Sequence, residues 1–199
     1  KTSKGNTIEA SFAVVDSGID LPEGTVSYDK VTGTDLSVNI NLAGYEIAKI
    51  SLNDTDLLGM EYYLDNTGTK LIFKYDYLKN LENGNYTYTV YSTSGASNTL
   101  TLEIKDTTPV FEGELEYDKS SGGSFTVRVQ LFGNAITELR VDDTVISAEK
   151  YSTVDGTLTI QADALSGLSV GEHTLTLKTV SSITVKLTIT DTVAEFSGE

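Results

Sequence analysis

The sequence predicts an all-β protein. Three observations predict this fold class: the chain repeats itself once, its apolar residues alternate along short segments, and turn residues separate those segments. Each copy has room for about seven strands, which is the number that a two-sheet sandwich of the immunoglobulin type uses. We therefore expect two tandem immunoglobulin-like antiparallel β-sandwich domains.

The repeat is plainest in one short phrase. GTVSYDK at residues 24–30 returns as GELEYDK at residues 113–119. An offset of 89 residues brings Tyr28 onto Tyr117 and Gly44 onto Gly133, and the offset falls to 87 and then to 85 only between periodic segments. Offsets that change in loops are typical of a duplication. The repeat predicts two domains, residues 1–108 and residues 109–199.

Both ends of the chain echo the repeat. NTIEASFAV at 6–14 is similar to NTLTLEIKD at 98–106, so residues 1–20 are either the closing strand of a preceding module or the first strand of domain one. DTVAEFSGE at 191–199 echoes DTTPVFEGE at 106–114. We therefore read residues 192–199 as the start of a further module.

The elements of each copy follow from the same patterns. Alternating apolar residues predict half-buried strands, and leucines three apart predict one helical turn. Asn83-Gly84 predicts a tight turn, and Pro109 a stiff linker. In chain order the paired strands are 36–42 with 125–131, 86–90 with 173–177, and 99–104 with 183–189, and the paired helical turns are 77–81 with 164–168.

Charge and composition exclude several kinds of partner. The formal net charge is −15, which makes nucleic acid an improbable partner because its binding begins with a basic patch. Cys is absent, so there is neither a disulfide nor a thiolate metal site. No apolar stretch reaches the ~20 residues of a membrane span. We expect no cofactor, and we expect an acidic surface to keep the protein monomeric.

A set of landmarks in the first copy resembles a known module. They are Tyr28–Lys30, Leu42–Gly44, Tyr62, Tyr77–Leu81, Gly84 and Lys105–Thr107. Together they look like the X2 module of bacterial carbohydrate-active and cellulosomal proteins. The second copy departs from the pattern at Ala164 and Thr190, which stand where the first copy has Tyr77 and Lys105.

The X2 resemblance implies an immunoglobulin-like module of an extracellular or cell-surface bacterial protein with several modules. Such modules space and solubilise neighbouring modules of the same polypeptide, and some bind polysaccharide or cell wall weakly. The resemblance supplies no catalytic residues, so we expect no enzyme. A resemblance to bacterial immunoglobulin-like adhesins leaves an alternative open, namely an adhesin fragment that binds a host or partner protein.

Tyrosines supply the candidate ligand-binding residues. Sugar rings have CH-rich faces that stack on exposed aromatic rings. Tyr45, Tyr63 and Tyr91 align with Asn134, Ser152 and Lys178, which are residue types that favour solvent. The three tyrosines are therefore our candidates for glycan binding, the alternative being scattered surface or interdomain tyrosines. The lack of Trp argues against a dedicated carbohydrate platform.

Other tyrosines recur in both copies. Tyr28 and Tyr62 align with Tyr117 and Tyr151, which predicts buried rings with hydrogen-bonded hydroxyls.

Carboxylates near predicted turns are secondary candidates for binding a cation. Asp54 and Asp56, with Asp142 and Asp143 in the second copy, offer hard oxygen ligands of the kind that calcium prefers. No stretch has the spacing of a calcium loop, and Asp beside Thr or Asn is ordinary turn chemistry. We favour turns and predict no metal.

His173 and two lysines complete the candidates. His173 is the single histidine and aligns with Tyr86, so we expect it to fill a tyrosine-sized space rather than to serve a nucleophilic serine. Lys30 and Lys119 recur at matching positions, which suggests either an intramolecular Lys–Asn cross-link or a charged strand edge that discourages aggregation. The edge is the favoured interpretation.

Overall fold

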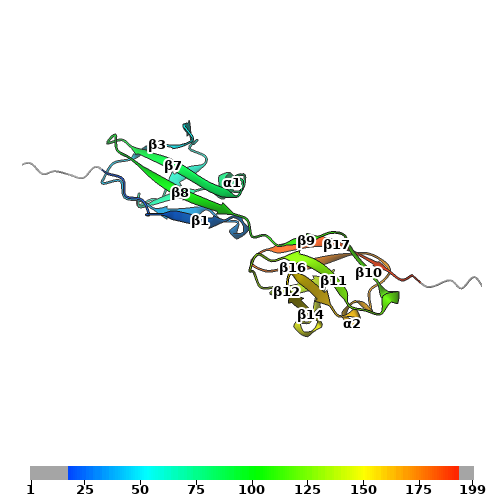
Figure 1. The fold of residues 1–199 in the computed structure, drawn as a ribbon. Coiled ribbons are helices and arrows are strands. Elements are labelled where there is room, and N and C mark those ends of the chain that lie inside the picture. The colour runs from blue at the N-terminus through cyan, green and yellow to red at the C-terminus, as the bar shows by residue number, and fades with distance from the viewer. Residues whose placement is uncertain (1–17, 193–199) are drawn as a thin grey trace, which may run out of the picture. The chain divides into compact units, whose positions relative to one another are not determined.

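The computed structural model describes residues 18–192 (Figure 1). The segment 6–14 and residues 193–199 lie outside the described residues. The chain divides into two compact units, one ending at Ile104 and the other beginning at Lys105, with Asp29–Gly33 counted in the second unit. We call the two repeats the first and the second module.

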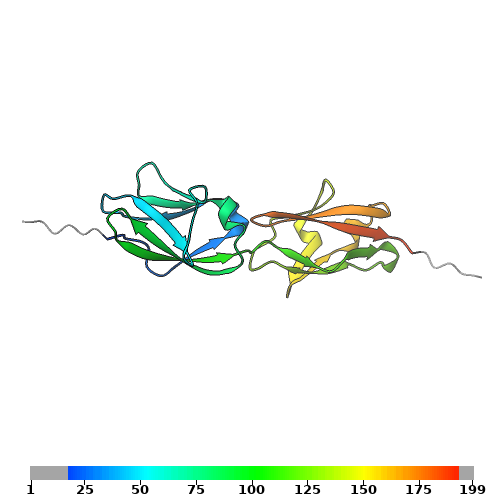
Figure 2. The same cartoon turned by 90° about the horizontal axis from the view of Figure 1, so that it is seen from above.

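The first module is a sandwich of a five-stranded and a three-stranded sheet, with strand orders β1-β8-β7-β3-β4 and β2-β6-β5 (Figures 1 and 2). An isolated bridge between Asp20 and Asn41 lies beside β2. The elements are β1 (Thr25–Asp29), β2 (Leu36–Asn39), β3 (Ile47–Leu52), β4 (Thr55–Asp56), β5 (Tyr62–Leu64), β6 (Lys70–Phe73), α1 (Tyr75–Leu78), β7 (Gly84–Ser92) and β8 (Ser97–Lys105), with a 3-10 turn at Lys30–Thr32.

The second module repeats this plan, with sheets β10-β17-β16-β12-β13 and β14-β15-β11-β9. Its elements are β9 (Val110–Glu112), β10 (Leu115–Asp118), β11 (Phe125–Gln130), β12 (Glu138–Val141), β13 (Thr144–Ile146), β14 (Tyr151–Val154), β15 (Thr157–Ile160), α2 (Ala162–Leu165), β16 (Gly171–Lys178) and β17 (Ser182–Thr190), with 3-10 turns at Lys119–Ser121 and Ala148–Lys150.

The all-β immunoglobulin-like fold class is confirmed, with one refinement. We expected antiparallel sheets throughout, but β10 runs parallel to β17, with Leu115 opposite Leu187 and Tyr117 opposite Ile189. The second strand of the module, β10, here lies beside its last strand, β17. The chain must cross the whole module between them.

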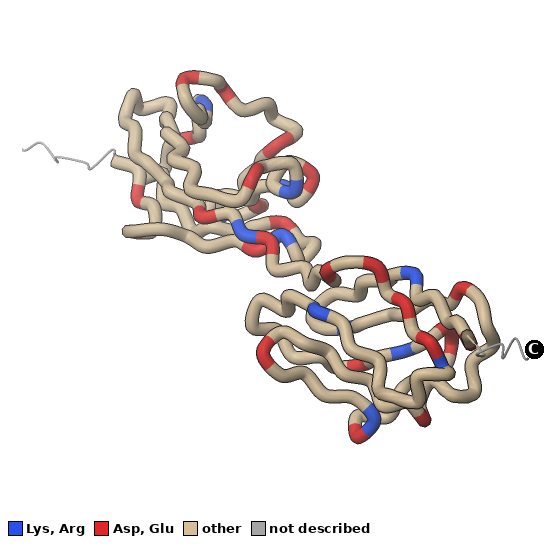
Figure 3. Tube along the Cα trace, turned by 45° about the vertical axis from the view of Figure 1, so that its right-hand side comes forward, with Lys and Arg blue, Asp and Glu red and all other residues tan. Residues whose placement is uncertain are grey.

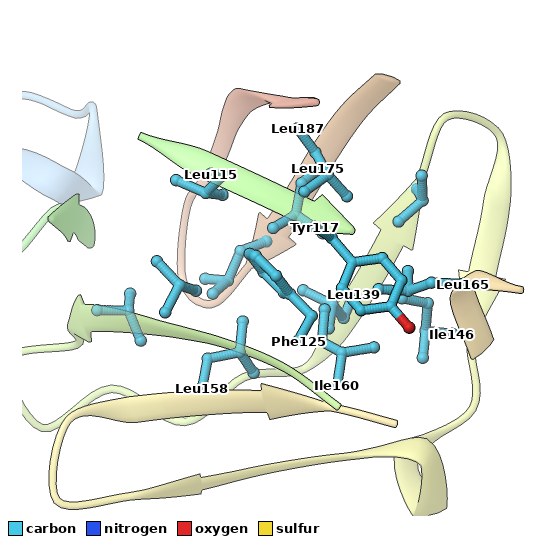
Figure 4. Packing of buried hydrophobic residues seen from close by; sticks show 14 of the residues in the cluster. Leu115, Tyr117, Phe125, Leu139, Ile146, Leu158, Ile160, Leu165, Leu175 and Leu187 are labelled. Atoms are coloured by element: carbon cyan, nitrogen blue, oxygen red, sulfur yellow. The ribbon is translucent and has the colours of Figure 1, made fainter. Parts of the chain in front are cut away.

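Alternation along the strands builds each core. On β11 the residues alternate between buried and exposed along the whole strand, as its sequence FTVRVQ predicts. Figure 4 shows the core of the second module, where Tyr117, Phe125 and leucines from both sheets meet. The first module has a separate core of its own, which includes Phe73 and Tyr88.

The two predicted helical turns are present, but they begin two residues earlier than the leucine pattern. α1 buries Leu78 completely and α2 buries Leu165 completely. These leucines fill equivalent places in the two cores. Burial of a Leu side chain contributes roughly 1.5–3 kcal/mol, which explains why such short turns persist.

The repeated tyrosines divide into two kinds. Tyr28 and Tyr117 are buried as predicted, and their hydroxyls donate to the carbonyl oxygens of Thr34 and Gly123. The same prediction is wrong for the pair at 62 and 151, which are only half-buried. They lie on β5 and β14, the edge strands of the smaller sheets. Tyr28 and Tyr117 also lie on edge strands, β1 and β10, so an edge position alone does not account for the difference in burial.

Candidate functional site

The structure does not bring the three candidate tyrosines together. Tyr63 points outward from the three-stranded sheet, because its neighbours on β5 pack against the core. Tyr91 points outward from the five-stranded sheet, because Val90 before it is buried. Tyr45 follows the loop after β2 and is 42% exposed. Tyr63 and Tyr91 therefore lie on opposite faces of the sandwich.

Lysines lie over two of these rings. The Nζ of Lys49 is 5.1 Å from the ring centroid of Tyr91, and the Nζ of Lys74 is 5.8 Å from that of Tyr63. Both contacts are cation–π pairs, which are worth ~0.5–1 kcal/mol at exposed sites. A sugar that stacked on either ring would have to displace the lysine or approach the other face.

The four candidate cation ligands belong to two tight hairpins. Asn53 and Asp54 form the two-residue loop between β3 and β4, and both have positive φ, at 48° and 62°. Asp142 and Asp143 form the corresponding loop between β12 and β13, with Asp142 at φ 51°. Asp and Asn tolerate this left-handed region, and such loops favour them.

Two of the four carboxylates are engaged in hydrogen bonds. Asp56 accepts from Ser51 Oγ and from Lys49 Nζ, and these bonds, the Ser51 bond first, lower the pKa of the Asp56 carboxyl. Asp142 accepts from His173 and from the amide of Thr174. Within residues 18–192, no three His, Cys, Asp or Glu side chains gather where a metal ion would need them.

His173 has an arrangement that the sequence did not reveal. Its Nδ1 lies 2.7 Å from Asp142 Oδ2, and its Nε2 lies 3.5 Å from Ser169 Oγ. The three side chains therefore have the order of a Ser-His-Asp triad, although the contact with Ser169 Oγ is at the limit of hydrogen-bond distance. Ser169 precedes β16 by two residues, so the turn into that strand creates the proximity.

The hydrogen bonds of His173 nevertheless do not suit a general base. Its Nε2 also lies 2.9 Å from the carbonyl oxygen of Ser169, and a carbonyl can only accept. Both ring nitrogens thus face acceptors, which favours the imidazolium. The bond to Asp142, followed by the bond to Ser169, raises the pKa of His173. An imidazolium has no lone pair to take a serine proton.

The recurring lysines contact other groups than Asn. The Nζ of Lys119 donates to the carbonyl of Leu168 at 2.8 Å, and the Nζ of Lys30 lies 4.0 Å from Asp106 Oδ2. Lys119 is thus a hydrogen-bond donor to a carbonyl, and Lys30 is the partner of a carboxylate. They give no support to a Lys–Asn cross-link.

The second module has a shallow hollow on the outer face of its four-stranded sheet. Its volume is about 480 Å³. Arg128 and Gln130 line it from β11, Glu112 from β9, and Asp155 from the loop between β14 and β15. This loop lies beside β11, because the carbonyl of Gly156 accepts from the amide of Val129 at 2.8 Å.

Phe132 lies at the end of this hollow and is 51% exposed. It occupies a turn in which the amide of Asn134 donates to the carbonyl of Leu131 at 2.9 Å. Phe132 and Gly133 have φ of 51° and 83°, as in a type I′ turn, which favours Asn or Gly. A bulky residue in this conformation costs of order 1–3 kcal/mol.

A hollow of about 520 Å³ lies in the equivalent place on the first module. Asn39 and Asn41 stand there where β11 has Arg128 and Gln130. The following turn has Ala43, with φ 52°, in the place of Phe132. Tyr45, at the far end of that turn, is not among the residues that line the hollow.

Sequence reasoning missed the residues that line the hollow of the second module. The signals available were the outward positions of β11 in FTVRVQL and the change from Ala-Gly to Phe-Gly between the copies. A comparison of the tyrosine positions does not reveal Phe132, because its counterpart in the first copy is Ala43. Glu112 and Asp155 reach the hollow only through strand pairing.

The sequence matches the carbohydrate binding domain X2 family twice, over residues 22–102 and 111–189. The chain belongs to this family. Each X2 match covers one module and contains most of its strands. The family is one of carbohydrate-binding domains and not of catalytic ones. No curated protein matches the chain.

Several solved structures are similar to this chain in fold. One is a tri-modular GH5 (subfamily 4) endo-beta-1,4-glucanase from Bacillus licheniformis complexed with cellotetraose, at 21% identity and TM-score 0.40 over 87% of this chain and 38% of that chain. Another is SGBP-B of the Bacteroides ovatus mixed-linkage glucan utilization locus in complex with a mixed-linkage heptasaccharide, at 16% identity and TM-score 0.36 over 94% and 49%.

A tandem of titin domains, I9–I11, is similar at 12% identity and TM-score 0.39 over 87% of this chain and 66% of that chain. At these identities the similarity concerns the fold alone. The X2 chain spans 38% of the endoglucanase chain, well under half of its length.

Proposed function

We propose that the two X2 modules are a non-catalytic extracellular pair that spaces and presents neighbouring modules of a multimodular bacterial protein and binds polysaccharide or cell wall weakly. The observation that carries this proposal is that each module closes on itself. Each has its own core, and the sites that remain are open hollows on outer sheet faces. Open faces suit a long chain, whereas small substrates are usually enclosed.

The geometry around His173 argues against a catalytic role. The one Ser-His-Asp arrangement in the described part of the chain has an imidazole whose two nitrogens both face acceptors. The acidic groups elsewhere are spread over both modules, with few lysines or arginines among them (Figure 3). This distribution of charge favours a soluble monomer.

An extracellular location follows from where the proposed ligands are found. Insoluble polysaccharide and cell wall are outside the cell, so a protein that binds them must be exported. Among residues 18–192, neither of the short helices has the length and apolar character that a membrane span requires.

Retention of the full chain on cellulose, xylan and purified cell wall tests this function. We expect measurable retention on at least one of them, and no release of reducing sugar on prolonged incubation. A variant with Tyr45, Tyr63 and Tyr91 changed to Ala tests whether these tyrosines contribute. Absence of retention on all three materials would contradict the glycan-binding part of the proposal, and release of sugar would contradict its non-catalytic part.

A further inference from the structure

We propose that the hollow beside Phe132 is the subsite at which the second module binds a neutral polysaccharide chain. This inference rests on the glycan binding proposed above and extends it by naming the face and the residues. None of the tyrosine candidates belongs to this face.

The first step is the position of Phe132. Neither burial nor backbone preference explains a Phe here, because the side chain is half exposed and the turn requires a positive φ. Four of the six described non-glycine residues with positive φ are Asp or Asn, and the equivalent residue of the first module is Ala43. An exposed ring kept in a strained conformation indicates a role in binding.

The second step is the set of polar groups beside the ring. Glu112 accepts from Gln130 Nε2 at 2.8 Å and pairs with Arg128 Nε at 3.5 Å. The carboxylate therefore holds a planar amide and a planar guanidinium along one strand, next to Phe132. Asp155 and Thr153 line the same hollow. Donors and acceptors that flank an aromatic ring match the hydroxyls and the CH face of a pyranose.

The third step is the charge of the hollow, which selects a neutral ligand. The guanidinium of Arg128 is balanced by Glu112, and Asp155 adds a further negative charge. The whole chain carries −15, so a polyanionic glycan or a nucleic acid would be repelled. A protein partner would require a larger apolar centre than one exposed ring.

The first module provides an internal comparison. Its hollow has a similar volume and has Asn39 and Asn41 on the equivalent strand, but Ala43 stands where the ring would be. The hollow of the second module therefore differs both in the ring of Phe132 and in its charged groups, among them Arg128 and Glu112. We expect the second module to contribute most of the glycan affinity of the pair.

Affinity gel electrophoresis of the full chain in soluble xylan and in hydroxyethyl cellulose measures this contribution. Phe132→Asn removes the ring and places Asn-Gly, the pair that a type I′ turn favours, in the turn. Arg128→Ala removes the guanidinium from an exposed position. We expect each variant to bind at least about tenfold more weakly than the wild type, as for a central binding residue, with an unchanged thermal unfolding midpoint or a higher one.

The triple tyrosine variant is the matched control, because it removes exposed rings from outside the hollow. Binding that this variant keeps and Phe132→Asn loses would support the inference. Binding that Phe132→Asn keeps, in either polysaccharide, would overturn the inference and leave the proposed function intact. A wild type that binds neither these polymers nor insoluble cellulose, xylan or cell wall would overturn both.

Discussion

Asp29 accepts hydrogen bonds from both the amide and the hydroxyl of Thr107, at 3.1 and 2.6 Å. The same carboxylate also caps the 3-10 turn that follows β1, by accepting from Val31 N. In the second copy Asp118 binds the amide and hydroxyl of Thr192 and caps the turn after β10. The repeated Tyr-Asp-Lys and Asp-Thr phrases therefore tie the start of each module to the residues that follow its last strand.

Asp29→Ala should destabilise the first module by about 1–2 kcal/mol, because the cap and the bonds to Thr107 are lost together. For a domain of this size the change corresponds to roughly 4–8 °C per kcal/mol in the unfolding midpoint. Differential scanning calorimetry of the full chain measures it. Glu46→Ala is the control, since that exposed side chain makes no such bond. An equal effect of both variants would contradict the prediction.

The lowered pKa of Asp118 leads us to expect a loss of folding stability at low pH. Hydrogen bonds from the Thr192 hydroxyl and then from Ser120 lower the pKa of Asp118 to about 2, against an ordinary value of 3.8. The folded pKa is below the unfolded one, so this contribution is present above pH 3.8 and is lost as the pH falls towards 2. Unfolding midpoints measured from pH 5 to pH 2 should fall less steeply in Asp118→Asn. Parallel curves for wild type and variant would refute this assignment.

For His173 we expect the opposite pH dependence near neutral pH, with stability falling as the pH rises. The pKa of His173 is raised, first by the bond to Asp142 and then by the bond to the Ser169 carbonyl. The stability that His173 contributes is therefore complete below about pH 6.5 and is lost as the pH rises through the pKa of the folded state. Glu172 and Lys186 line the pocket beside it. An NMR titration is unambiguous because the chain has one histidine. The midpoint should lie above 6.5 and fall in Asp142→Asn; a midpoint at or below 6.5 in the wild type would disprove the arrangement.

Phe132→Asn should stabilise the second module by about 1 kcal/mol, because Asn tolerates the left-handed conformation that strains Phe. Ala43→Asn in the equivalent turn of the first module measures the contribution of the turn without the loss of a ring. Thermal unfolding of both variants provides the comparison. A destabilised Phe132→Asn would mean that the ring packs against the module, and that its conformation needs no binding role.

Much of the fold was predictable because it depends on local periodicity. Alternation in FTVRVQL correctly predicted which side chains of β11 are buried, and leucines three apart predicted both helical turns. The burial of the recurring tyrosines was not predictable in this way. Tyr62 and Tyr151 recur in both copies as Tyr28 and Tyr117 do, but only Tyr28 and Tyr117 are buried.

The candidate site was less predictable, because strand pairing is not local. Tyr63 and Tyr91 are both exposed as their alignment suggested, but they are on different sheets and so cannot form one surface. Asp142 and His173 are 31 residues apart in sequence and meet only because the turn between β12 and β13 lies beside the start of β16.

The sequence by itself determined the duplication, the fold class and the family, since each of these is written in residue spacing along the chain. Only the tertiary structure decided which exposed side chains share a face. Arg128, Gln130 and Phe132 follow one another along one strand and its turn, but Glu112 and Asp155 join them through the pairing of β9 with β11 and of β15 with β11. Side-chain direction along a strand is set by neighbouring residues, whereas the order of strands in a sheet is set by the packing of the whole module.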